Sequence, residues 1–135
     1  MSVPLLEVEG LRTHFFTKAG VVRAVDDVSF TLDRGEVLGL VGESGSGKSI
    51  TGYSIMGLVD PPGRIVEGSI RLDGTELTTL DAESMRKLRG NRVAMIFQDP
   101  MMTLNPVLRI DRQMMEAILA HANVPEAAAR ARARD

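Results

Sequence analysis

The sequence predicts an α/β protein, in which an antiparallel β region is followed by a core of parallel strands and helices. Residues 5–32 hold two stretches of alternating or β-branched side chains, which are typical of antiparallel strands. An apolar run, residues 37–41, leads into a glycine-rich segment and then a helical pattern. A second apolar run, residues 93–97, has the length of a buried strand. These observations together predict the fold class.

The antiparallel region is expected to consist of two strands, one within residues 5–11 and one within residues 21–32. Residues 13–20 between them predict a polar loop that displays Phe15 and Phe16. Such rings either stack on a flat ligand such as a nucleobase or pack under the sheet. Residues 33–36 then form a tight turn that feeds the first apolar run.

The glycine-rich segment satisfies G-x-x-x-x-G-K-[ST] with Gly42, Glu43, Ser44, Gly45, Ser46, Gly47, Lys48 and Ser49. Backbone N–H groups that point into a tight loop hold a polyphosphate, so side chains must be absent where the backbone approaches the anion. Lys48 can place its ammonium on the β and γ phosphates, and the Ser49 hydroxyl can bind Mg²⁺. The segment predicts a phosphate-binding loop; the alternative is a surface turn rich in glycine and serine. A dinucleotide motif is excluded, because it would need glycine in place of Ile50.

A helix is predicted to begin at Lys48 and to end at residues 60–63, Asp-Pro-Pro-Gly. Its buried stripe should follow the helical spacing of Gly52, Ile55, Met56 and Val59. Because the N-terminal end of a helix is positive, this helix would face the same anion as the loop.

Residues 67–74 predict a short strand that closes on an Asp-Gly turn. Asp81 can cap a helix that runs to about Arg89 and ends at Gly90 or Asn91. Gln98 directly follows the second apolar run, at the carboxyl end of the strand predicted there. Ligands of open α/β sheets bind at that edge, so Gln98 is expected to face the phosphate-binding loop.

Two further helices are predicted, over residues 110–121 and 125–135. We expect the apolar stripe of residues 110–121 to lack a partner within the chain, which would lead to self-association or to disorder near that end. The methionines at positions 95, 101, 102, 114 and 115 either form an adaptable docking surface or fill gaps in a core.

Composition narrows the class of protein. The chain has 135 residues, enough for one domain at most, and its net charge of −2 gives no support to nucleic-acid binding. No cysteine is present, which excludes disulfides and thiolate chemistry. No signal peptide and no membrane-spanning stretch is visible, so a location in the cytoplasm is expected, with peripheral contact to a membrane protein left open.

Four segments resemble the ATP-binding subunits of ABC transporters, and within them the oligopeptide and dipeptide import branch. They are residues 24–30, 42–49, 55–58 and 95–106, and the likeness covers nearly the whole chain. The resemblance implies an α/β fold with a P-loop NTPase (RecA-like) core at residues 35–104. An N-terminal antiparallel β subdomain would precede it at residues 1–34, and the start of an α-helical subdomain would follow at residues 105–135.

The resemblance also implies roles for particular residues. Phe15 would stack on adenine, with Phe16 the neighbouring candidate, and residues 42–49 would hold the phosphates, helped by the backbone N–H of Ile50. Lys48 and Gln98 would be the catalytic residues. Ser49 and Gln98 would share Mg²⁺, and Gln98 would sense the γ-phosphate.

The implied partners are a second ATP-binding subunit, identical or paralogous, and transmembrane permease subunits that dock near residues 101–108, at the cytoplasmic face of the membrane. No L-S-G-G-Q signature and no apolar strand ending in Asp-Glu occurs in the sequence. We therefore interpret the chain as the N-terminal part of a longer peptide-import ATPase, which alone binds ATP better than it hydrolyses it. The alternatives are an ABC-type ATPase that acts on ribosomes or in DNA repair, and a non-catalytic nucleotide-binding module.

Overall fold

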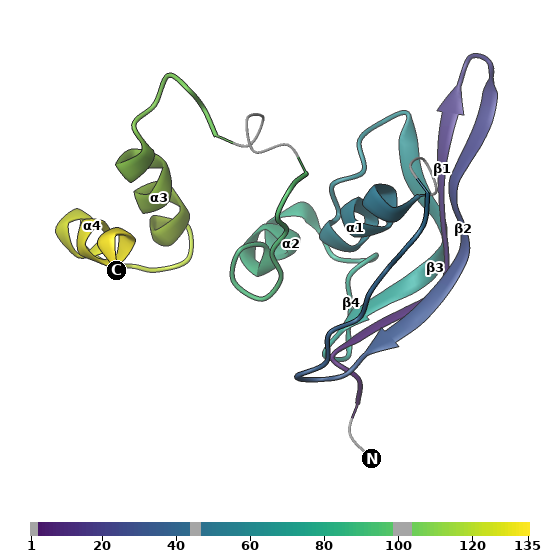
Figure 1. The fold of residues 1–135 in the computed structure, drawn as a ribbon, viewed down its shortest axis with the longest axis horizontal. Helices are drawn as coiled ribbons and strands as arrows, with labels where there is room; N and C mark the ends of the chain where they lie inside the picture. The colour runs from purple at the N-terminus through teal and green to yellow at the C-terminus, as the bar shows by residue number, and fades with distance from the viewer. Residues whose placement is uncertain (1–2, 44–46, 99–103) are drawn as a thin grey trace. The chain divides into compact units, whose positions relative to one another are not determined.

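The computed structural model describes residues 3–43, 47–98 and 104–135, which form two compact units, Met1–Met85 and Arg86–Asp135 (Figure 1). The elements are β1 (Leu6–Thr17), β2 (Gly20–Leu32), α1 (Lys48–Met56), β3 (Gly63–Leu72), β4 (Thr75–Glu76), α2 (Ala82–Leu88), α3 (Ile110–Leu119) and α4 (Glu126–Arg134). None of the helices in the described ranges has the length and hydropathy needed to cross a membrane.

The first unit is built on an antiparallel sheet with the strand order β2-β1-β3-β4. β1 and β2 pair from Leu6 opposite Leu32 to Thr17 opposite Gly20, which confirms the predicted antiparallel region. The predicted polar loop at residues 13–20 is wrong, because β1 continues through these positions to Thr17. Residues 18–19 alone connect the two strands, so both phenylalanines lie within a strand.

An extra residue bends β1. Val8 and Leu11 are both buried, although a spacing of three places two residues on opposite faces of a regular strand. The pairing shifts by one position between them, and Gly10 takes a positive φ of 56° there. The Gly10 N–H leaves the ladder and donates to Ser29 Oγ at 2.8 Å. Gly10 therefore forms a β-bulge, which keeps the apolar residues on one face and coils the sheet.

The bulge requires a glycine on the neighbouring strand. Gly68 on β3 has a φ of 106°, and a Cβ atom there would lie 2.6 Å from both Gly10 O and Leu11 Cα. Backbone atoms on both strands would have to move. We expect Gly68→Ala to lower the free energy of unfolding by about 2–4 kcal/mol in urea denaturation, from strain and overpacking together.

Gly20→Ala is the matched control for that substitution. Gly20 also has a positive φ, 133°, but no heavy atom lies within 4 Å of its Cβ position. It should cost only about 1 kcal/mol, the strain of the backbone alone. Equal losses at the two positions would contradict the role assigned to the contact between β1 and β3.

On the face of the sheet opposite to α1, ion pairs cross the strands. Arg71 lies opposite Glu7, and its Nε donates to Glu7 Oε2 at 2.9 Å, while a terminal nitrogen lies 3.0 Å from Glu9 Oε1. Hydrogen bonding to Glu7 raises the pKa of the Arg71 guanidinium.

A second set of hydrogen bonds joins β4 to β3. Glu76 on β4 accepts from the Ser69 hydroxyl at 2.5 Å and from the Ile70 N–H at 2.9 Å. This network ties β1, β3 and β4 together.

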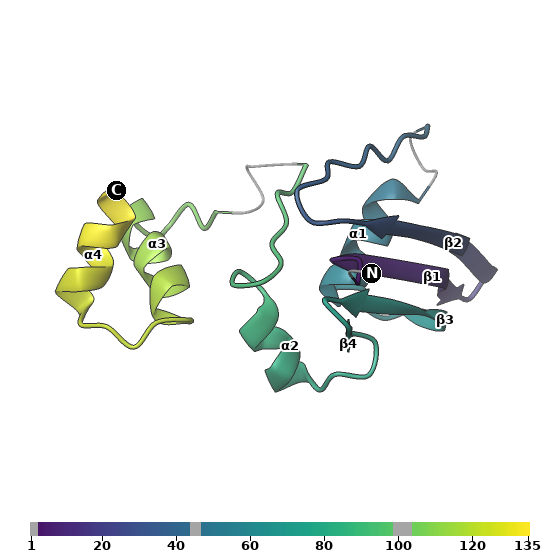
Figure 2. The same ribbon diagram turned by 90° about the horizontal axis from the view of Figure 1, so that it is seen from below.

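Helix α1 lies on the other face of the sheet (Figures 1 and 2). It contacts β1 through a buried hydrogen bond of 2.7 Å between the hydroxyls of Thr13 and Ser54. Ser54 gives its proton to the Ile50 carbonyl oxygen at 2.7 Å, so the Thr13 hydroxyl is the donor between the two. The helix thus rests on the sheet through polar groups that satisfy one another.

The predicted helix at Lys48 is confirmed, but its stripe and its end differ. Thr51 and Ser54 are buried together with Met56, whereas the other stripe positions are half-buried. Both hydroxyls bond within the helix, which removes the cost of burying them. Gly57, at φ 68°, ends the helix before the predicted stop.

The predictions for residues 67–74 and for the helix after Asp81 are confirmed. β3 starts earlier, at Gly63, and Asp73 and Gly74 both have the positive φ that a tight hairpin turn requires. Asp81 Oδ1 accepts from the Ser84 N–H at 2.7 Å and caps α2. Gly90, with φ 77°, follows that helix as expected.

The two apolar runs are not strands. Val37 and Val41 are 96% and 92% exposed, and Ile96 is 99% exposed. A parallel strand is stable only with hydrogen-bonded neighbours and covered faces. Neither run has such neighbours among the described residues, where the second run shows one isolated bridge between Arg89 and Val93. The predicted strands at residues 37–41 and 93–97 are therefore wrong for this structure.

In the second unit, α3 and α4 form the predicted pair of helices and pack together. Met115 on α3 and Ala129 on α4 are buried, and Arg130 lies 3.2 Å from Asp111. The expectation that the stripe of residues 110–121 lacks a partner is wrong at Met115, since α4 covers it. Ile110 and Met114 remain exposed.

Candidate functional site

The structure places the end of the glycine-rich segment directly on the helix. Lys48 is the first residue of α1, and its ammonium donates to the carbonyl oxygens of Gly42 and, at 3.3 Å, Glu43. Residues 42–43 and the helix start are therefore linked by the lysine side chain. The predicted site residues Ser44, Gly45 and Ser46 lie outside the described residues.

Gly47 shows why the loop needs glycine at this point. Its φ is 94°, and a Cβ atom would lie 2.3 Å from the carbonyl oxygen of Ala24 on β2. The loop thus packs its backbone against the backbone of a strand. Residue type could not indicate this role for Ala24, because the contact is made by its main-chain carbonyl group.

The start of α1 is suited to an anion. Gly47 occupies the N-cap and supplies no side-chain acceptor, and the first N–H groups of a helix have no acceptor within the helix. Ser49 is exposed at the second helical position, and Ile50 behind it is half-buried. An ammonium, a hydroxyl and free N–H groups fit a polyphosphate with its Mg²⁺: the hydroxyl can bind the metal and the other groups the phosphate oxygens.

The two phenylalanines lie on opposite faces of β1. Phe15 has the same strand parity as Thr13, whose hydroxyl contacts α1, and its ring lies over Gly63 of β3. Phe16 points to the other face, where it is 40% exposed and Arg64 stacks on its ring at 4.6 Å. The face that carries the phosphate-loop helix therefore carries Phe15.

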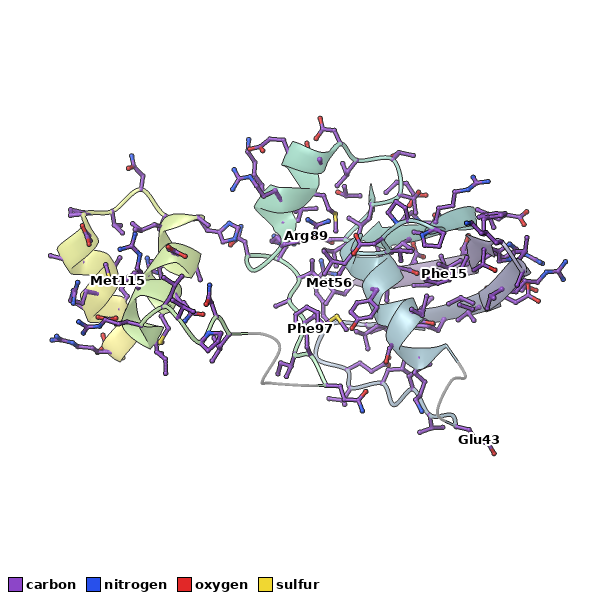
Figure 3. All side chains as sticks on the ribbon, turned by 90° about the horizontal axis from the view of Figure 1, so that it is seen from above. Phe15, Glu43, Met56, Arg89, Phe97 and Met115 are labelled. Atoms are coloured by element: carbon purple, nitrogen blue, oxygen red, sulfur yellow. The ribbon has the colours of Figure 1, made fainter. Side chains whose placement is uncertain are left out.

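Figure 3 shows that Phe15 lies against the sheet and that Glu43 lies well apart from it, at the end of the extended segment. A ligand that touched both the aromatic ring and the loop would have to be elongated, as a nucleoside triphosphate is.

Gln98 is exposed and belongs to the second unit. Residues 99–103, which include the start of the predicted docking segment at residues 101–108, lie outside the described residues. The shared Mg²⁺ site of Ser49 and Gln98 therefore stays a prediction, as does the catalytic role of Gln98.

A glycine-lined loop that ends in Lys-Ser at the start of a helix defines a phosphate-binding loop protein. Comparison with protein families places the chain more exactly. Residues 25–134 match the family described as ABC transporter, and the chain belongs to that family.

Curated relatives cover nearly all of this chain. The oligopeptide transport ATP-binding protein AppD of Bacillus subtilis is 52% identical over 130 residues, 96% of this chain. The dipeptide transport ATP-binding protein DppD of Haemophilus influenzae is 50% identical over 87% of the chain, and OppD of Escherichia coli is 48% identical over 93%. The chain spans 40%, 36% and 37% of the length of these three relatives.

Solved structures agree on the fold. A dimeric bacterial ABC transporter cassette, MJ0796, matches 94% of this chain and 53% of its own with a TM-score of 0.80 at 21% identity. The same cassette bound to ADP and Pi matches with a TM-score of 0.79. At this identity the likeness concerns the fold alone. The predicted fold class, a P-loop NTPase with an antiparallel N-terminal sheet, is confirmed, although the two apolar runs do not form strands here.

Proposed function

We propose that this chain is part of an ATP-binding subunit that powers the import of oligopeptides or dipeptides across a membrane by ATP hydrolysis. The observation that carries the proposal is the geometry of Gly47 and Lys48 at the start of α1. The relatives at about 50% identity, named for oligopeptide and dipeptide transport, support the peptide substrate.

In this proposal the residues of the chain bind and orient the nucleotide. The ammonium of Lys48 and the N–H groups of the first helical turn neutralise the phosphate oxygens. Ser49, with Gln98, would hold Mg²⁺, which supplies charge stabilisation for phosphoryl transfer when bound. Phe15 would stack on the adenine at the face of the sheet that carries α1.

The proposed partners are a second ATP-binding subunit and transmembrane permeases, on the cytoplasmic face of the membrane. Support for the first comes from the neighbour solved as a dimer, and support for the second from relatives named as transport proteins. If the protein were instead an ABC-type ATPase that acts on ribosomes, its partner would be the ribosome rather than a permease. Recovery of the complete protein with ribosomes, and never with permeases, would favour that class.

Residues 1–135 alone are proposed to bind ATP without efficient hydrolysis, because no signature sequence and no strand ending in Asp-Glu lies among them. We expect calorimetry to detect ATP binding by this chain and a phosphate-release assay to detect no turnover above background. Calorimetry and the phosphate-release assay should be carried out on the same protein preparation. Robust phosphate release would contradict the proposal that the activating carboxylate lies elsewhere.

A further inference from the structure

We propose that Gly63 is a positioning residue for the nucleotide base. Because it lacks a side chain, the Phe15 ring can lie directly against the backbone of β3, in the position from which it would stack on the base. The inference rests on the proposed function, in which Phe15 stacks on adenine, and adds a residue on another strand to that site.

The geometry of the pair is direct. Phe15 and Gly63 are cross-strand partners in the register of β1 and β3. A Cβ atom on Gly63 would lie 2.5 Å from one ring carbon of Phe15 and 2.8 Å from two others. Since carbon atoms in contact lie about 3.5–4.0 Å apart, the ring would have to move by about 1 Å. The Phe15 ring occupies the space that a side chain at position 63 would fill.

The backbone itself does not require glycine at this position. Unlike Gly47 or Gly68, Gly63 has a φ outside the left-handed region, so alanine can adopt its conformation. The ring contact therefore remains as the reason for glycine here. This separates Gly63 from the glycines that serve turns and bulges.

Hydrogen bonds connect this contact to the turn that follows α1. The Gly63 N–H donates to Asp60 O at 2.8 Å, and the Phe16 N–H donates to Pro62 O at 2.9 Å. The turn after α1 thus holds Gly63 on one side and the strand of the aromatic ring on the other. At its other end the helix begins with Gly47 against β2. One continuous segment, residues 47–63, therefore contacts the ring at one end and the strand beside the phosphate loop at the other, so a displaced ring would miss a base whose phosphates are already bound.

The test compares two ligands, ATP and inorganic tripolyphosphate, by calorimetry on the 135-residue chain. We expect Gly63→Ala to weaken ATP binding about three- to tenfold, the range of one lost aromatic contact, and to change tripolyphosphate binding less than twofold. Tripolyphosphate has no base, so it reports on the loop alone. Gly39→Ala is the matched control, because Gly39 has no positive φ and no heavy atom within 4 Å of its Cβ position.

Phe15→Leu shows whether Gly63 acts through the ring. It should produce the same selective loss, and adding Gly63→Ala to it should produce no further loss, since a leucine can turn away from the new methyl group. Phe16→Leu, on the other face, should leave both affinities unchanged. Thermal unfolding of each variant establishes that it is folded at the temperature of the measurement.

The outcomes separate the inference from the function on which it rests. If Phe15→Leu weakens ATP selectively but Gly63→Ala does not, the positioning role is wrong and base stacking stands. If Gly63→Ala weakens ATP and tripolyphosphate equally, the residue supports the fold rather than the ring, and the inference is again overturned. If Phe15→Leu leaves the ratio of the two affinities unchanged, the proposed stacking itself fails.

Discussion

Lys48→Ala is expected to abolish measurable ATP binding, a loss of at least about 100-fold in affinity, because two or more charge-assisted contacts to phosphate disappear. The same substitution removes the link between the ammonium and the carbonyl oxygens of Gly42 and Glu43, so the loop also loses an internal support. Titration calorimetry with ATP measures the effect.

Lys18→Ala is the control for this loss. Lys18 is an exposed lysine in the connection between β1 and β2, and its removal changes the net charge by the same amount. ATP affinity should be unaltered in that variant. An unchanged affinity in Lys48→Ala would remove this residue from the site and leave the phosphate-loop assignment without its cation.

Gly47→Ala is expected to remove ATP binding to a similar extent and also to lower the free energy of unfolding by about 2–4 kcal/mol. The new methyl group would meet the Ala24 carbonyl oxygen at 2.3 Å, and the φ of 94° is strained for any residue with a Cβ atom. Since the obstacle is backbone, the start of α1 must move away from β2. The helix N–H groups would then leave their phosphate-binding positions.

Gly74→Ala separates collision from strain in that experiment. Gly74 has a comparable φ of 84°, but its Cβ position has no heavy atom within 4 Å. It should cost about 1 kcal/mol in urea denaturation and leave ATP affinity unchanged. Wild-type ATP affinity in Gly47→Ala would show that the contact between loop and strand does not shape the site.

The local pattern predicted the Asp-Gly turn after β3 and the positions of the helices, because the residues that form these elements lie within the segments themselves. Asp81 caps α2 through a neighbour three residues away, and the Asp-Gly turn before β4 needs only its own two residues. The bulge at Gly10 had a signal in the sequence, because Val8 and Leu11 are both apolar but three positions apart. When only strict alternation is considered, this spacing indicates an irregular strand rather than a bulge.

Long-range contacts were harder to predict. The stripe of α1 was misplaced because two of its buried positions, Thr51 and Ser54, are polar. Their hydroxyls donate to carbonyl oxygens one turn earlier, and Ser54 also accepts from Thr13 on β1, a contact that the local pattern does not show. The runs at residues 37–41 and 93–97 have the composition of buried strands but no neighbours among the described residues. The composition of a segment shows that it can form a buried strand, but it forms one only where neighbouring strands are present to pair with it.

For the candidate site, the sequence motif predicts Gly47, Lys48 and Ser49, because their chemistry depends on residue type. It could not decide between Phe15 and Phe16, since neighbours in a loop have no fixed sides. Once β1 is seen to run through both positions, strand parity separates them. The local pattern indicated Gly63 only as part of a helix stop. Its contact with Phe15 leaves no local signal, because the two residues lie 48 positions apart in the chain.

The extra residue in β1 has a consequence for how this sheet tolerates changes in length. A chain without Gly10 would still hold Val8 and Leu11 on one face, because two positions would then separate them and no bulge would be needed. Such a shortened strand would lose its bend instead, and would swing the hairpin end that carries Phe15 relative to α1. The number of residues in β1 therefore contributes to the distance between the Phe15 ring and the start of α1.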